Sequence, residues 1–134
     1  MNNEIRWEQR FANFEKAFLL IDEVSDVEFE SLSQLEKEGV VQRFEILIEL
    51  SWKVLKDYLE NRGYSDVKNA KLAIKQAFID EIITDPEDWM GALQKRNLTS
   101  HTYDEKILDQ TVTYIQESFY PMVRDLYQRL KKEL

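Results

Sequence analysis

The stretch from residue 96 to residue 105 holds the side chains of this chain that are best suited to chemistry. Its functional groups are a fixed cation, an amide, the only imidazole of the chain, a phenol and a carboxylate, on Arg96, Asn97, His101, Tyr103 and Asp104. A histidine can exchange a proton near neutral pH, and an arginine can neutralise phosphoryl oxygens through its planar fork. Arg96 and His101 therefore fit metal-free cleavage of a phosphodiester, with His101 as general acid or base. The alternative is structural: His101 is a solvated residue near a helix cap, and Arg96 pairs with acidic neighbours.

The spacing of these residues decides whether they can act together. Arg96 and His101 are five residues apart, so in an unbroken α-helix their side chains would point about 140° apart. Residues Thr102 to Glu105 fit a capping box, however, with Thr102 as the N-cap of a new helix. The sequence thus predicts a corner near residues 98–100 that could bring Arg96 and His101 to the same side. His101 would lie just outside a helix N-terminus, where the dipole favours neutral imidazole and free N–H groups attract phosphate.

The composition favours long helices to hold this corner. The 134 residues include only three glycines and two prolines, too few for the many tight turns of an all-β protein. At this length we expect one domain over residues 1–134, with a true hydrophobic core. Apolar periodicity and capping residues predict helices over residues 3–23, from the thirties to 62, 65–83, from 85 to the corner, and from 103 to near the end. Pro121 is expected to kink the last helix unless the helix breaks there.

The second predicted helix is the longest and the most apolar, and Gly63 is expected to end it. Its apolar residues cover more than half of the circumference, which is typical of a central helix that touches several neighbours. We expect an exposed charged strip on the rest of the helix, made of Glu45, Glu49, Lys53, Lys56 and Asp57. Glu49 and Lys53, four residues apart, should form an ion pair on it. Trp52 lies at its edge and fits either an interface or the core.

Several classes of site are excluded or disfavoured by composition. The absence of cysteine rules out disulfides, thiolate nucleophiles and cysteine-based zinc sites. The sequence has no glycine-rich phosphate loop and no cluster of metal ligands, so we expect no metal and no cofactor. It also shows no signal peptide and no apolar run long enough to cross a bilayer, so we expect a cytoplasmic protein without membrane contact.

The charge of the chain bears on nucleic acids. A formal net charge of −8, from 18 basic and 26 acidic residues, argues against passive binding of DNA or RNA. A local cationic site could still act on RNA if dimerisation or a basic partner builds it.

Three segments of the sequence together resemble one known family. They are residues 42–45 (QRFE), residues 49–59 (ELSWKVLKDYL) and residues 96–105 (RNLTSHTYDE). Over nearly its whole length the chain resembles the nucleotidyltransferase substrate-binding protein family, which belongs to the HEPN superfamily. The resemblance implies an all-α fold, namely an up-and-down four-helix bundle with an additional short helix. It also implies a small nucleotidyltransferase as partner, a homodimer, and a heterotetramer when the partner is bound.

The resemblance also implies roles for the corner. Many HEPN proteins are metal-independent endoribonucleases with an R-x4-6-H motif, which makes Arg96 and His101 the catalytic residues and Asn97 the polar residue that often follows the arginine. Asp104 is a further supporting residue. Two copies of the motif are expected to face each other across the dimer, which concentrates positive charge. In related toxin–antitoxin pairs the motif extends to R-x4-H-x-Y, and the partner transfers AMP to the tyrosine, here Tyr103. AMP at this position would add bulk and negative charge beside His101 and block RNA.

Two functions remain open from the sequence. In the first, the chain is a toxin-like ribonuclease that acts on RNA and is silenced by AMPylation of Tyr103. In the second, it is a non-catalytic subunit that complexes with a nucleotidyltransferase and binds its substrate or nucleotide at the same corner. The intact motif favours the first function, and the net charge of −8 favours the second.

Overall fold

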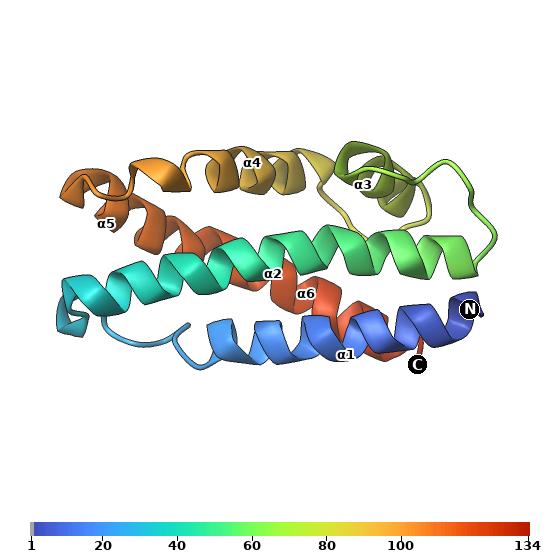
Figure 1. Cartoon of the computed structure of the whole chain (residues 1–134), viewed down its shortest axis with the longest axis horizontal. Helices are drawn as coiled ribbons and strands as arrows, with labels where there is room; N and C mark the ends of the chain where they lie inside the picture. Colours follow the sequence, from blue (N-terminus) through green and yellow to red (C-terminus); the bar gives the residue numbers. More distant parts are fainter. Residues whose placement is uncertain (1) are drawn as a thin grey trace.

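The computed structural model describes residues 2–134, which form an antiparallel bundle of helices (Figure 1). The elements in order are α1 (Asn3–Asp22), η1 (Phe29–Ser31), α2 (Gln34–Asn61), α3 (Ala70–Ile79), α4 (Pro86–Asn97), η2 (Thr99–His101), α5 (Glu105–Tyr114), η3 (Ile115–Phe119) and α6 (Tyr120–Lys131). Helices α1, α2 and α4 and the arm made of α5, η3 and α6 run up and down, and α3 is the additional short helix. The predicted fold class is confirmed. No helix in this part of the chain combines the length and the apolar character that crossing a membrane requires.

Helix α2 lies at the centre of the bundle and contacts α1, α3, α4 and α5. Its buried residues occupy most of its circumference, as expected: Val40, Val41, Phe44, Leu47, Ile48, Ser51, Val54, Leu55, Asp57, Tyr58 and Leu59. Helix α1 packs along α2 and buries a stripe of aromatic residues, Trp7, Phe11, Phe14 and Phe18. Trp7 packs on Tyr58 of α2, whereas the three phenylalanines contact the ring of Tyr127 in α6, so the stripe joins α1 to two neighbours.

The ends of α2 and α4 follow from local sequence. Ser33 caps α2 in a reciprocal pair, in which Glu36 N–H donates to Ser33 Oγ (3.1 Å) and Ser33 N–H donates to Glu36 Oε1 (2.8 Å). Gly63 follows α2 with φ of 100°, a left-handed conformation that glycine adopts without strain. Asp85 caps α4, and Pro86 stands in its first turn. The predicted stop at Gly63 and start at Asp85 are confirmed.

The third helix is shorter than predicted. The sequence predicted a helix over residues 65–83, whereas α3 spans Ala70–Ile79. Asn69 caps α3 by accepting a hydrogen bond from the N–H of Leu72 (2.9 Å), so the polar residues before it stay outside the helix. After α3, Glu81 adopts a left-handed conformation with φ of 62°, and the chain turns toward α4.

The proline of the last arm is accommodated by a wider helical turn. Pro121 has no N–H, and in an α-helix its ring would press on the carbonyl of Glu117. The turn η3, just before Pro121, is π-helical, with looser winding than an α-helix. The chain therefore continues into α6 without a break, and the arm passes diagonally behind α2 (Figure 1).

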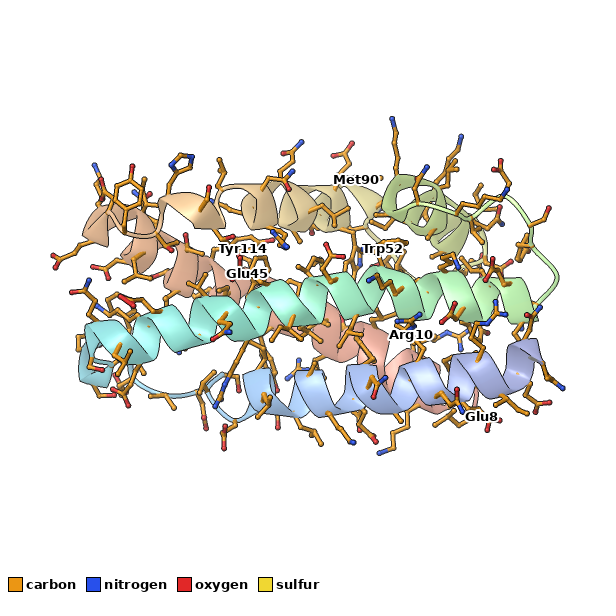
Figure 2. The ribbon with its side chains drawn as sticks, in the orientation of Figure 1. Glu8, Arg10, Glu45, Trp52, Met90 and Tyr114 are labelled. Atoms are coloured by element: carbon orange, nitrogen blue, oxygen red, sulfur yellow. The ribbon has the colours of Figure 1, made fainter. Side chains whose placement is uncertain are left out.

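A buried ion pair joins α1 to α2, where the sequence predicted an exposed charge. Asp57 is buried, with 2% of its surface exposed, so its placement in an exposed strip was wrong. Its Oδ2 lies 2.8 Å from Nε of Arg10, and Lys56 Nζ lies 3.7 Å from Oδ1. Figure 2 shows Arg10 at the boundary between α1 and α2. The carboxylate can stay in the core because these cations compensate its charge.

We expect Arg10→Met to lower the free energy of unfolding by about 1–3 kcal/mol. Methionine keeps the apolar stem but leaves the Asp57 carboxylate with Lys56 as its remaining cation. Because Arg10 is partly exposed, the loss of unfolding free energy should stay below that for a fully buried ion pair. Urea unfolding followed by circular dichroism measures the change. Arg6→Met is the matched control, since Arg6 forms a longer, more exposed pair with Glu60 (3.8 Å) and should cost under about 0.5 kcal/mol. Equal losses would contradict the role given to Asp57.

Candidate functional site

The predicted corner is present and consists of two short turns. Helix α4 ends at Asn97, and η2 follows after the single residue Leu98. The N–H of His101 donates to the carbonyl of Leu98 (3.1 Å), and the N–H of Asp104 donates to the carbonyl of His101 (3.2 Å). Thr102 Oγ1 also donates to the carbonyl of Thr99 (2.8 Å). These local bonds reverse the chain between α4 and α5.

The cap of α5 differs from the prediction. Asp104, rather than Thr102, is the N-cap, and its Oδ1 accepts the N–H groups of Lys106 (2.9 Å) and Ile107 (3.3 Å). Thr102 does not serve because its backbone is helical (φ −73°, ψ 0°), whereas an N-cap residue is extended, as Asp104 is (φ −80°, ψ 120°). His101 therefore lies three residues before the cap, and the two amides that could attract a phosphate already have an acceptor.

Helix α2 anchors the corner through a hydrogen bond that the sequence analysis missed. Thr99 is buried, and its Oγ1 lies 2.7 Å from Oε2 of Glu45 and 2.7 Å from the carbonyl of Arg96. Figure 2 shows Glu45 on the side of α2 that faces α4 and α5. The four-residue spacing of Glu45 and Glu49 on one face of α2 was the available signal, and it was interpreted as a solvated strip.

Arg96 faces α2. Its Nε lies 3.9 Å from Oε1 of Glu49 and is buried without a hydrogen-bond partner among residues 2–134. The guanidinium borders a shallow groove of about 470 Å³, lined by Gln42, Glu45, Ile46, Glu49, Leu50, Lys53 and Arg96. The predicted pair of Glu49 with Lys53 is not among the ion pairs found in this part of the chain. The Lys53 ammonium lies instead 6.0 Å from the ring centre of Trp52.

His101 and Tyr103 lie on the solvent side of the corner. Both are exposed, Tyr103 with 81% of its surface, and their ring centres are 6.3 Å apart. Asn97 is also exposed. Among the described residues no hydrogen bond or ion pair joins Arg96 to His101, and His101 does not line the groove beside Arg96. A single chain thus presents both side chains at one corner without a polar bond between them in the part of the chain that the structure describes.

A second cavity lies on the other side of α4. It has a volume of about 530 Å³ and is lined by Glu87, Asp88, Gly91, Gln94, Lys95, Leu98, Tyr114, Ser118 and Met122. Burial, with a smaller effect from the charge of Asp88, raises the pKa of Tyr114 to about 12, so its phenol keeps its proton at neutral pH. Lys95 lies 5.3 Å from the centre of the Tyr114 ring. Within residues 2–134 no group of three or more acidic, histidine or cysteine side chains is arranged to hold a metal ion.

We expect Asp104→Ala to lower the free energy of unfolding by about 1 kcal/mol, because the first amides of α5 lose their acceptor. Asp104→Ser should retain most of this stability, since a serine hydroxyl also caps helices. Thermal unfolding of the three proteins measures both effects. If Asp104→Ala unfolds like the unchanged protein, another group must cap α5.

Comparisons with known proteins give concordant results. The sequence pattern of a family described as "Nucleotidyltransferase substrate binding protein like" matches residues 9–132. A protein of Haemophilus influenzae named "Probable ribonuclease HepT" is 33% identical over 72 residues, which cover 51% of this chain and 49% of that protein. The match therefore spans about half the length of that curated relative.

Two solved structures share the fold. A crystal structure of a protein from Thermus thermophilus superposes with a TM-score of 0.75 and 29% identity, over 89% of this chain and 97% of that chain. A Haemophilus influenzae protein, whose structure is described as the fold of a substrate-binding domain of a nucleotidyltransferase, gives a TM-score of 0.71 over 97% and 99% of the two chains. At 24% identity, this second likeness shows the fold alone.

Proposed function

The chain belongs to the nucleotidyltransferase substrate-binding protein-like family, and on this premise we propose that it is the HEPN subunit of a two-component nucleotidyltransferase system. In this proposal it is a metal-independent ribonuclease, of the toxin–antitoxin kind, and the partner nucleotidyltransferase silences it by transferring AMP to Tyr103. The observation that carries the proposal is the exposed corner, which presents His101 and Tyr103 side by side, with Arg96 at its inner edge.

The chemistry assigned to the corner is proton transfer and charge neutralisation. In metal-independent RNA cleavage, the 2′-oxygen of a ribose attacks the neighbouring phosphorus and the bond from phosphorus to the 5′-oxygen breaks. A base takes the proton of the 2′-hydroxyl, and an acid gives a proton to the departing 5′-oxygen. His101 is suited to either transfer, and Arg96 to the charge that develops on the phosphoryl oxygens. Asn97 and Asp104 are proposed as supporting residues.

A homodimer fits this chemistry better than a single chain. Two proton transfers are needed, and each chain has one histidine. A second copy of the corner would supply a second imidazole and a second guanidinium at the same phosphodiester. It would also concentrate positive charge locally in a chain whose net charge of −8 repels RNA at long range.

The position of Tyr103 supports control by AMP. Its phenol is accessible to a second protein, because 81% of the residue is exposed. Its ring centre is 6.3 Å from that of His101. An adenylyl group on the phenol would place a phosphate and a nucleoside beside the imidazole, where they would exclude an RNA phosphate by charge and by bulk.

We expect His101→Ala to abolish RNA cleavage and growth toxicity, because the proton-transfer group is lost. Since His101 is exposed, the fold should be unchanged, which circular dichroism can check. Cleavage of a fluorescent RNA and growth of expressing cells are the measurements. Ser100→Ala, at the exposed neighbouring position, is the matched control and should cleave normally. Full cleavage by His101→Ala would remove His101 from the mechanism.

Incubation with the partner nucleotidyltransferase and ATP should add the mass of one AMP to this chain, and Tyr103→Phe should prevent the addition. Intact-mass spectrometry measures the adduct. Tyr64→Phe is the control, because Tyr64 is partly buried and donates a hydrogen bond to Asp80, so it should leave the adduct in place. An adduct on Tyr103→Phe would place the modification on another residue.

A non-catalytic subunit is the second candidate. Two observations favour it: the net charge of −8, and the absence, within residues 2–134, of a hydrogen bond or ion pair between Arg96 and His101. In this case the chain binds a nucleotidyltransferase and its substrate or nucleotide at the corner. A stable complex with the partner, without an AMP adduct and without RNA cleavage, is the result that would select it.

A further inference from the structure

Arg96 has one ion-pair partner among residues 2–134. Its Nε lies 3.9 Å from Oε1 of Glu49 without a hydrogen bond, and no ion pair of these residues involves its two Nη groups. An arginine binds a phosphate through paired N–H donors, so the Nη edge is the part of this guanidinium that an anion can use. The attraction of Glu49 for the Nε edge favours an orientation in which the Nη edge is left for an anion.

Glu49 is itself fixed by a neighbour on α2. The indole Nε1 of Trp52 donates a hydrogen bond to Oε2 of Glu49 (3.2 Å), while Oε1 is the oxygen that faces Arg96. One carboxylate oxygen of Glu49 thus bonds to Trp52, and the other faces Arg96. Trp52, Glu49 and Arg96 form a short chain of contacts from the surface of α2 to the end of α4. This gives Trp52 a specific partner beyond a general core role.

A neighbouring glutamate acts differently. Glu45 accepts a hydrogen bond from the Thr99 hydroxyl, so it fixes the backbone of the corner through a neutral donor. Glu49 acts on a cation through its charge. The two residues are one helical turn apart on α2 and border the same groove, which leaves two carboxylates beside the guanidinium.

We propose that Glu49, oriented by Trp52, is a positioning residue that turns the Nη edge of Arg96 toward the phosphodiester, while its negative charge opposes anion binding. The inference rests on the proposed ribonuclease function for its kinetic consequence, but the geometry of the three side chains does not depend on it. Positioning raises the rate of the chemical step, whereas the negative charge of Glu49 weakens the binding of any phosphate. Removing the charge of Glu49 should therefore slow the chemical step and tighten the binding of the phosphate.

Glu49→Gln separates charge from packing. The glutamine amide oxygen can still accept the Trp52 hydrogen bond, so the variant should fold normally while it loses the attraction for Arg96. In RNA cleavage, we expect the KM and the kcat of this variant each to fall by about two- to fivefold, the size expected for a partly exposed ion pair. A merely structural role would not lower the KM. Unchanged kinetics, or a raised KM, would overturn the proposal.

Two further variants separate the role of Trp52 from a general effect of charge on α2. Trp52→Phe keeps an aromatic ring and the carboxylate but removes the donor, so the kcat should fall while the KM stays within about twofold. Glu60→Gln is the matched control, because Glu60 is another ion-paired glutamate of α2 that pairs with Lys56 (3.2 Å) and not with Arg96. Its kinetics should equal those of the unchanged protein. A similar loss in Glu60→Gln would show that any charge change on α2 has this effect.

The role of Glu49 can also be tested without RNA, by NMR and phosphate binding, so the test holds even if the protein is not a ribonuclease. The side-chain N–H at Nε of Arg96 can be followed by nitrogen-15 NMR and assigned with Arg96→Lys. We expect Glu49→Gln to shift this resonance and to tighten the binding of inorganic phosphate by about two- to fivefold. An unmoved resonance with unchanged phosphate affinity would refute the role of Glu49. Lack of RNA cleavage by the unchanged protein would instead refute only the proposed function.

Discussion

The structure depends on the breadth of the apolar surface of α2. A helix that buries residues over most of its circumference must have neighbours on several sides, and here α1, α3, α4 and α5 provide them. The polar face of α2 is therefore narrow, and part of this face lies against the end of α4. The carboxylates on this polar face therefore meet the corner at residues 96–105 as a result of how the core packs. Fold and candidate site are linked through one helix, so a change on the polar face of α2 can alter the candidate site without disturbing the core.

Much of the fold could be predicted because its determinants are local. The stop at Gly63 needs only one residue that tolerates a left-handed backbone, and the start at Asp85 and Pro86 needs only its own first turn. The prediction failed where two local solutions competed. Thr102 and Asp104 can both cap a helix, and the choice depended on the backbone, which is helical at Thr102 and extended at Asp104. The third helix was overestimated for the same reason, since Asn69 offered a cap inside the apolar pattern.

In the candidate site, too, the local features could be predicted. The sequence showed the spacing of Arg96, His101 and Tyr103 and indicated the break between two helices. The contacts between the corner and α2 could not be predicted, because they join residues far apart in the chain. Glu45 bonds to Thr99 across 54 positions, and in the core Asp57 likewise bonds to Arg10 across 47. A pattern on one helix shows which residues share a face, but whether that face meets solvent or another helix is decided by tertiary packing. Glutamates interpreted as solvated therefore proved to be contacts of the corner.

The π-helical turn η3 links the length of the last arm to its proline. The buried residues of the arm follow one another at steps of three or four, so α5 and α6 bury faces of matching direction: Leu108, Val112, Ile115, Phe119, Val123, Leu126 and Leu130. A π turn holds about one residue more than an α turn, so removal of one residue from η3 would let the arm wind as a regular α-helix with nearly the same phase. The ring of Pro121 would then press on the preceding turn. The extra residue and the proline are therefore coupled, and the bundle should tolerate a deletion in η3 better when Pro121 is replaced as well.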